Sequence, residues 1–172
     1  TGQAYQFAAE FPHPEVGHLR LGDVVWHPGR LQEYAAIKRW ISPVSGVISI
    51  SGELEHLRDK GDGVHVQIIA GNGGRLGEWS VLKSSTNTEV KEYQVSEGET
   101  IDFVLDKNGN TNSDASKWIP VIRLVKQTGG PASEVTVWNA RQDFSPPPPP
   151  PLGQWEQVIQ ALMLTNEFLF VD

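Results

Sequence analysis

The feature that most constrains the fold is a series of short stretches in which apolar and polar residues alternate. In VHVQI (residues 64–68), for example, the three apolar residues fall on one side, and His65 and Gln67 fall on the other. A period of two is typical of a β-strand with one buried face. Turn-forming sequences such as DKGDG, GNGG and SEGE separate the stretches, at the spacing of about 8–12 residues that is common in all-β proteins.

About eight to ten such strands are predicted, which is a number typical of sandwiches and barrels. They lie at residues 19–26 (one or two strands), 34–41, 46–54, 64–68, 76–82, 88–95, 100–105, 117–125 and 134–138. No helical stretch separates them, and a parallel βαβ arrangement would need one at each crossover. We therefore predict an all-β fold, a jelly-roll-like antiparallel β-sandwich that occupies residues 1–145 and carries a short C-terminal helical tail.

The tail differs in character from the rest of the chain. Residues 146–151 are six consecutive prolines, which cannot donate to a β-ladder and predict a stiff polyproline II linker. Residues 152–172 follow as an amphipathic helix and an extended end, with Leu152, Trp155, Val158, Ile159 and Leu162 on one helical face. A helix this short is marginal alone, so it packs either on this sandwich or on another domain of the parent protein.

Composition excludes several classes of function. The 172 residues carry a net charge of −7 and no cluster of Lys and Arg, whereas a nucleic-acid-binding face must be basic. Cysteine is absent, which excludes disulfides, thiolate metal sites and haem attachment through paired cysteines. No apolar stretch approaches the roughly 20 residues of a transmembrane helix. The chain begins TGQAYQF, without a signal peptide, and reads as a piece of a longer protein.

Six tryptophans are more than a core of this size needs, so some are candidates for ligand binding. A flat aromatic face can stack on the apolar side of a sugar ring. Trp26 and Trp79 lie beside loop sequences and are the better candidates, and Tyr34 would extend the same surface. Trp118 is either an edge residue of this platform or a core residue. The remaining three have other expected roles: Trp40 in the core, and Trp138 packed against Trp155 where the tail docks.

The loop DKNGNTNSDAS carries an oxygen-bearing side chain at every second position. Calcium takes six to eight oxygen ligands, so a calcium site is one hypothesis for this loop. Its predicted ligands are Asp106, Asn108, Asn110 and Asp114.

An EF-hand is excluded, because Thr111 stands where the motif needs Gly and Lys117 stands where it needs Glu. The alternative to a calcium site of another kind is that these side chains cap the backbone of their own loop. Asp59 and Asp62, in the turn DKGDG, raise the same two possibilities. The histidines show no ligand spacing, and His27 before Pro28 is expected to make a loop contact.

Three stretches, EYAAIKRWISPVSGVISISG, GDGVHVQII and EGETIDFVLDKNGNTNSDASKW, resemble a family of bacterial β-sandwich modules. These modules are similar in build to carbohydrate-binding jelly rolls and occur in large exported proteins. The ending from Trp138 to Asp172 resembles the C-terminus of planctomycete surface proteins that also contain a cytochrome-like region. The resemblance implies a cell-surface location and sugar binding; no haem is implied, because the cytochrome region is not in this chain.

No catalytic signature accompanies these features: there is no G-x-S-x-G elbow, no phosphate-binding loop and no dinucleotide fingerprint. The predicted function is therefore that of a non-catalytic carbohydrate-binding module, periplasmic or extracellular, which binds polysaccharide or another glycan through exposed aromatics. The alternative is a structural or assembly domain that contacts protein at the cell surface. An enzyme acting on carbohydrate is a third, weaker interpretation.

Overall fold

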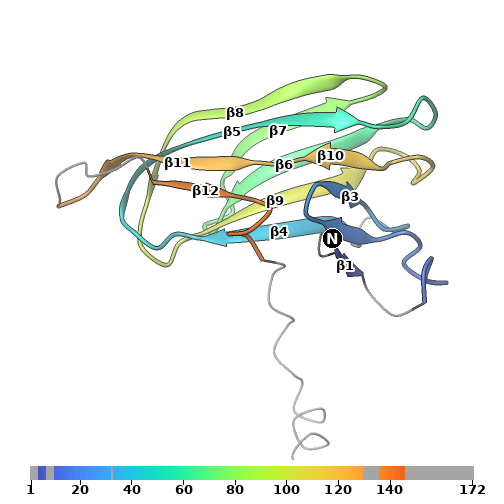
Figure 1. The fold of residues 1–172 in the computed structure, drawn as a ribbon, viewed down its shortest axis with the longest axis horizontal. Coiled ribbons are helices and arrows are strands. Elements are labelled where there is room, and N and C mark those ends of the chain that lie inside the picture. The colour runs from blue at the N-terminus through green and yellow to red at the C-terminus, as the bar shows by residue number, and fades with distance from the viewer. Residues whose placement is uncertain (1–3, 7–9, 32, 130–135, 146–172) are drawn as a thin grey trace, which may run out of the picture.

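Two antiparallel β-sheets form the described part of the chain (Figure 1). The computed structural model describes residues 4–6, 10–31, 33–129 and 136–145. All of the strand pairs in this part are antiparallel, and side chains from both sheets share one core. The predicted antiparallel sandwich is thus confirmed.

The larger sheet is built around a long central strand, β5 (Gly46–His56). One edge of β5 pairs with β8 (Ser85–Val95), and its other edge is shared by β10 (Ser116–Trp118) and β11 (Val121–Gln127). The remaining strands extend the sheet in two directions: β3 (Val25–His27), β2 (Arg20–Gly22) and β1 (Ala4–Gln6) beyond β10, and β12 (Val137–Asn139) beyond β11.

Pro120 divides the predicted strand 117–125 into β10 and β11. Proline has no N–H to donate to the ladder, and its Cα lies 3.1 Å from the position that a Cβ would take on Gly52 of β5. The glycine therefore lets the two chains approach closely at the interruption.

The smaller sheet has the order β4 (Ala36–Ile41), β9 (Thr100–Lys107), β6 (Val64–Ala70) and β7 (Arg75–Val81). Along β6, buried and half-buried residues alternate without exception, as the sequence predicts for this strand. Arg39 on β4 faces Asp102 on β9 in the register, and two 2.7 Å hydrogen bonds join the guanidinium to the carboxylate. Strands β4 and β7 form the two edges of this sheet.

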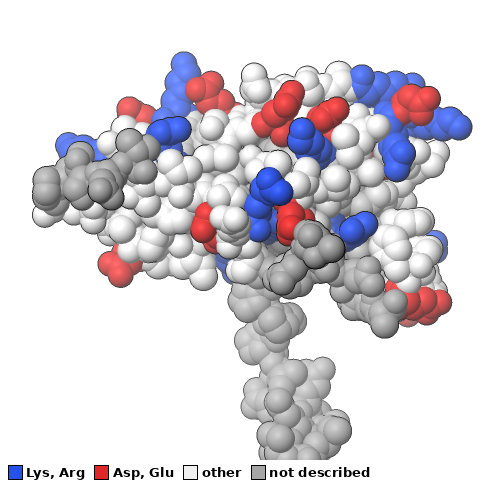
Figure 2. Space-filling model, viewed as in Figure 1, with Lys and Arg blue, Asp and Glu red and all other residues white. Residues whose placement is uncertain are grey.

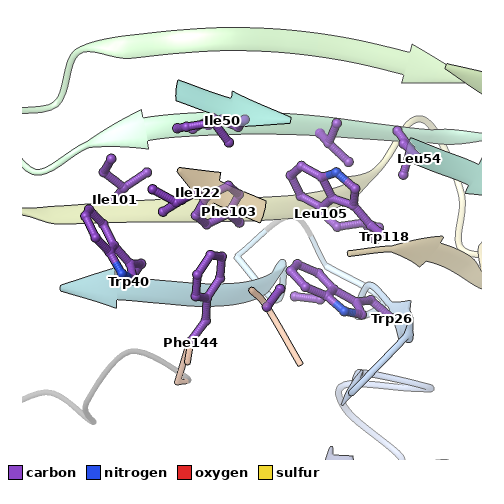
Figure 3. Packing of buried hydrophobic residues seen from close by; sticks show 14 of the residues in the cluster. Trp26, Trp40, Ile50, Leu54, Ile101, Phe103, Leu105, Trp118, Ile122 and Phe144 are labelled. Carbon is purple, nitrogen blue, oxygen red and sulfur yellow. The ribbon is translucent and has the colours of Figure 1, made fainter. Parts of the chain in front are cut away.

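Aromatic side chains fill the space between the sheets (Figure 3). The ring centroids of Trp26 and Trp118 lie 5.2 Å apart, and Phe103 lies 5.8 Å from Trp118 and 4.8 Å from Phe144. These residues come from β3, β10, β9 and the segment after β12, so the core joins distant parts of the chain. Trp40 is 1% exposed, and its predicted place in the core is confirmed.

A lysine also points into this core. Lys38 occupies an inward position of β4 and is only 3% exposed. Its Nζ donates a 2.7 Å hydrogen bond to the carbonyl of Ala140 and lies 5.1 Å from the centre of the Trp26 ring. Burial lowers the pKa of Lys38 to about 8, although the charge of Asp23 acts in the opposite direction.

The predicted proline linker at 146–151 and the helix and extended end at 152–172 lie outside the described residues. Trp138 packs on Trp40 with ring centroids 5.2 Å apart, and its predicted partner Trp155 lies outside the described part as well. Within the residues that the structure describes, no helix is long and apolar enough to cross a membrane.

Candidate functional site

The structure corrects two of the predicted sugar-binding aromatics. Trp26 and Trp118 are both 0% exposed and point between the sheets (Figure 3). The Trp118 Nε1 donates a 3.1 Å hydrogen bond to the hydroxyl of Thr88, which is also buried. Neither indole can present a face to a ligand, so the prediction of an exposed platform at these two residues is wrong.

The other two predicted aromatics are half-buried and far from each other in the sheet order. Trp79 on β7 is paired with the buried Val66, and its ring lies over Gly77 on the core side of the strand. Tyr34 precedes β4, which is the opposite edge of the smaller sheet from β7. Trp79 and Tyr34 therefore do not form one platform.

A cleft of about 550 Å³ opens instead at one end of the sandwich. Its basic side is formed by His18, His27 and Arg30 from the N-terminal segments and by Arg58 after β5. Its other side is the loop between β9 and β10, which contributes residues 110–113 and Ala115. Four separate parts of the sequence thus meet here. We call the side with the histidines and arginines the basic wall, and the side formed by the β9–β10 loop the loop wall.

Backbone hydrogen bonds hold both walls in place. His13 and Gly17 exchange two hydrogen bonds of 2.9 and 2.8 Å, and Arg30 N donates to the carbonyl of Val16 at 2.9 Å. On the opposite side, Leu57 N donates to Ala115 O at 3.0 Å, which ties the end of β5 to the loop wall. The cleft is therefore built on fixed backbone rather than on long free segments.

The charges of the basic wall are available to a ligand. Arg30 and Arg58 are exposed, and neither belongs to any of the ion pairs found among the described residues. Burial and the neighbouring His18 lower the pKa of His27, although its hydrogen bond to the Pro28 carbonyl opposes them. Because that carbonyl only accepts, His27 Nδ1 carries the proton of the 2.7 Å bond. Neutral His27 therefore leaves Nε2 as an acceptor.

An aromatic row that the sequence analysis missed lies beside the basic wall. The rings of Phe11 and His18 meet edge to face at 5.4 Å, and His18 lies 5.5 Å from His27. Phe11 is 43% exposed. No local spacing in the sequence indicates that residues 11, 18 and 27 come together. The predicted loop contact of His27 is present as its hydrogen bond to Pro28.

The four predicted calcium ligands do not act alike. Asp106 Oδ1 accepts from Lys107 N at 2.8 Å, and Asn110 Oδ1 accepts from Asn112 N at 2.8 Å, so both cap the loop backbone. Asn108 is exposed and donates to the carbonyl of Asp62 at 2.9 Å. In the described part of the chain, no three His, Cys, Asp or Glu side chains are close enough to hold a metal by themselves.

Asp114 is the exception in this set. It is 0% exposed, and neither of its carboxylate oxygens has a hydrogen-bond partner within the described residues. Asp62 Oδ1 is likewise buried and unpartnered. Burial, and next the charge of Asp62, raise the pKa of Asp114 to about 7. The two carboxylates are therefore close enough to affect each other, and they lie behind the loop wall of the cleft.

Comparison with known proteins gives distant structural similarities only. No family model and no curated protein matches the chain. The PA14 sugar-binding domain from an RTX adhesin is 11% identical with a TM-score of 0.38, covering 60% of this chain and 50% of that one. The GH26-CBM35 β-(1,4)-mannanase of Podospora anserina is 13% identical with a TM-score of 0.36, covering 76% of this chain and 26% of the enzyme. At these TM-scores neither similarity says what this chain binds, and neither bears on the predicted planctomycete origin or cytochrome association.

Proposed function

We propose that this chain is a non-catalytic glycan-binding domain and that its ligand is an acidic polysaccharide held in the cleft. The observation that carries the proposal is the pair of exposed arginines on the basic wall, Arg30 and Arg58, which form no ion pair with any described residue. A guanidinium binds a carboxylate or a sulfate through two parallel hydrogen bonds. An acidic sugar is therefore the ligand that these two residues favour.

The remaining lining suits the neutral part of a sugar. Thr111 and Ser113 offer hydroxyls and Asn110 and Asn112 offer amides, which can bind sugar hydroxyls as donors or acceptors. The exposed ring of Phe11 gives an apolar face at the end of the aromatic row. The volume of about 550 Å³ is within the range of about 300–1,000 Å³ of small-molecule sites, which suits a short segment of a polysaccharide.

Because the overall charge is negative, binding of an acidic polymer would depend on the two arginines in the cleft. With a net charge of −7, the chain as a whole repels an acidic polymer. Figure 2 shows Lys and Arg interspersed with Asp and Glu over most of the face that it displays, with several Lys and Arg gathered around an acidic group at the upper right. Binding would therefore depend on short-range contacts with Arg30 and Arg58 and would weaken as salt screens them. Polysaccharides of this kind lie outside the cytoplasm, so the proposal implies a periplasmic or extracellular protein.

Affinity electrophoresis tests the proposal directly. The chain is run in native gels that contain polygalacturonate, alginate or a sulfated galactan, and in parallel gels with a neutral glucan or mannan. We expect retardation by at least one acidic polymer, and we expect Arg30→Gln combined with Arg58→Gln to abolish it. Arg123→Gln combined with Lys126→Gln removes the same two charges from exposed positions of β11 and serves as the control, which should stay retarded.

Two outcomes would overturn the proposal: no retardation by any acidic polymer, or equal retardation of the double variant and the parent chain. The predicted assembly role would then take its place if the chain self-associates in light scattering and if deletion of residues 146–172 abolishes the association. Retardation by neutral polymers alone would keep glycan binding but would contradict the role given to the two arginines.

A further inference from the structure

Buried carboxylate oxygens without partners lie behind the loop wall of the cleft. Both oxygens of Asp114 and the Oδ1 of Asp62 are buried and accept no hydrogen bond from any described residue. Buried polar atoms are nearly always paired, and each exception calls for a partner that the protein atoms alone do not supply. Carboxylates need such a partner more than neutral groups do, because charge is the costliest thing to bury.

A third oxygen is held beside them by the shape of the backbone. Gly61 has a φ of +88°, and a Cβ on it would overlap the carbonyl oxygen of Asn112 and lie 3.6 Å from Asp114 Oδ1. The Asn112 carbonyl oxygen and Asp114 Oδ1 therefore both lie close to Gly61, the residue that precedes Asp62. A side chain at residue 61 would fill the space between them.

Asp62 is oriented so that only one of its oxygens remains free. Its Oδ2 accepts hydrogen bonds from Gly109 N at 2.9 Å and from Asn110 N at 3.1 Å. Asn108 Nδ2 donates to the Asp62 carbonyl at 2.9 Å. These bonds to the loop fix the orientation of the carboxylate, while its Oδ1 has no hydrogen-bond partner among the described residues.

We propose that Asp62, Asp114 and the main-chain carbonyl of Asn112 bind a divalent cation of the calcium class. All three supply hard oxygen ligands, which suit calcium and not zinc or copper. Two carboxylates match the charge of the ion, and water would complete its six to eight oxygens. Of the four ligands predicted from the sequence, this set keeps only Asp114.

The local charges support a cation at this point. Asp62 and Asp106 place negative charge around Asp114, and Lys107 is the positive group that partly offsets it. A divalent ion would supply the missing positive charge to all three acids.

The cation would also connect the turn at residues 57–63 to the loop at 108–114. Asn110, Thr111, Asn112 and Ser113 of that loop form one wall of the cleft. A bound cation would therefore hold the loop wall of the cleft in one position. This consequence rests on the proposed glycan binding, whereas the cation site itself does not.

Isothermal titration calorimetry tests the site on the full chain after treatment with EDTA and dialysis at pH 8. We expect one calcium ion to bind, with weaker binding of magnesium and none of zinc at this site, and a rise in thermal midpoint with calcium. Asp114→Asn and Asp62→Asn should each lower the calcium affinity at least tenfold. Asp59→Asn, an exposed acid in the same turn, should bind calcium like the parent chain.

Absence of any heat and of any change in midpoint with calcium or magnesium would overturn the proposal, and so would unchanged binding by both variants. Near-ultraviolet circular dichroism of each variant shows whether its core is intact, so that loss of binding is not confused with unfolding. Affinity electrophoresis in EDTA separates the two proposals. Retardation by a polysaccharide, together with no calcium binding in calorimetry, would overturn only the proposed cation site. Calcium binding in calorimetry without retardation by any polysaccharide would overturn only the proposed glycan binding.

Discussion

Replacing Lys38 by methionine should alter how the free energy of unfolding varies with pH more than it alters the free energy of unfolding at pH 7. Burial lowers the pKa of Lys38 from 10.5 to about 8, so the folded chain releases this proton before the unfolded chain does. Between pH 8 and 10.5 the unfolded state therefore binds more protons, and the free energy of unfolding rises with pH. The slope approaches about 1.4 kcal/mol per pH unit, which gives a gain of about 2.5 kcal/mol between pH 7 and pH 10.

At neutral pH the substitution has opposing effects. Methionine removes a buried charge, but it leaves the Ala140 carbonyl without its donor, at a cost of about 1–3 kcal/mol. It also removes the contact with the Trp26 ring, worth roughly 0.5–2 kcal/mol. The pH-dependent part is therefore the sharper test of the buried lysine.

Urea unfolding followed by tryptophan fluorescence at pH 7, 8, 9 and 10 measures the effect. The parent chain should gain stability relative to Lys38→Met across this range, while Lys91→Met, at an exposed position of β8, should run parallel to the parent. Tyr93, whose pKa is raised to about 12 by its hydrogen bond to Glu99, is present in the parent chain and in both variants, so its effect on stability cancels in the comparison. Parallel curves for the parent chain and Lys38→Met would refute a buried, charged Lys38.

Two further predictions concern the core and the cation site. Thr88→Val removes the acceptor of the buried Trp118 Nε1 and should cost about 1–3 kcal/mol in urea unfolding, whereas Thr88→Ser keeps the hydroxyl and should cost less. Gly61→Ala should lower the thermal midpoint more than Gly73→Ala does: both glycines have positive φ, +88° and +83°, but only at residue 61 would the Cβ overlap the Asn112 carbonyl. Equal losses at the two glycines would contradict the close approach at residue 61.

The strands were predictable because each long strand repeats its pattern several times. Apolar and polar residues alternate from Val64 to Ile68 in strand β6, so its inward face follows from the sequence alone. Trp26 and Trp118 lie in strands of three residues, where alternation has too few positions to decide which face is buried. Their burial is decided by pairing with distant strands, which the local pattern does not contain.

The cleft and the cation site were predictable only in part, for a related reason. Arg30 and Arg58 meet the loop wall through contacts between segments far apart in the sequence, and no local spacing signals such a meeting. The sequence indicated Asp114 and raised Asp62 as a question. It also grouped Asp114 with Asp106, Asn108 and Asn110, whose side chains make hydrogen bonds to the backbone, because a loop does not keep the two-residue period of a strand.

Two buried ionisable groups of this fold differ in a way that separates structural from ligand-binding roles. Lys38 and Asp114 are both almost fully buried, and burial shifts the pKa of each toward its neutral form. The lysine has a carbonyl and an aromatic ring as partners within the chain, so its role is satisfied by the fold itself. The aspartate has no such partner among the described residues, and Asp62 beside it adds a like charge. A divalent cation would supply the partner that the Asp114 carboxylate lacks, whereas the Lys38 ammonium already has its partners. The proposed cation site therefore includes Asp114, and the role of Lys38 is structural.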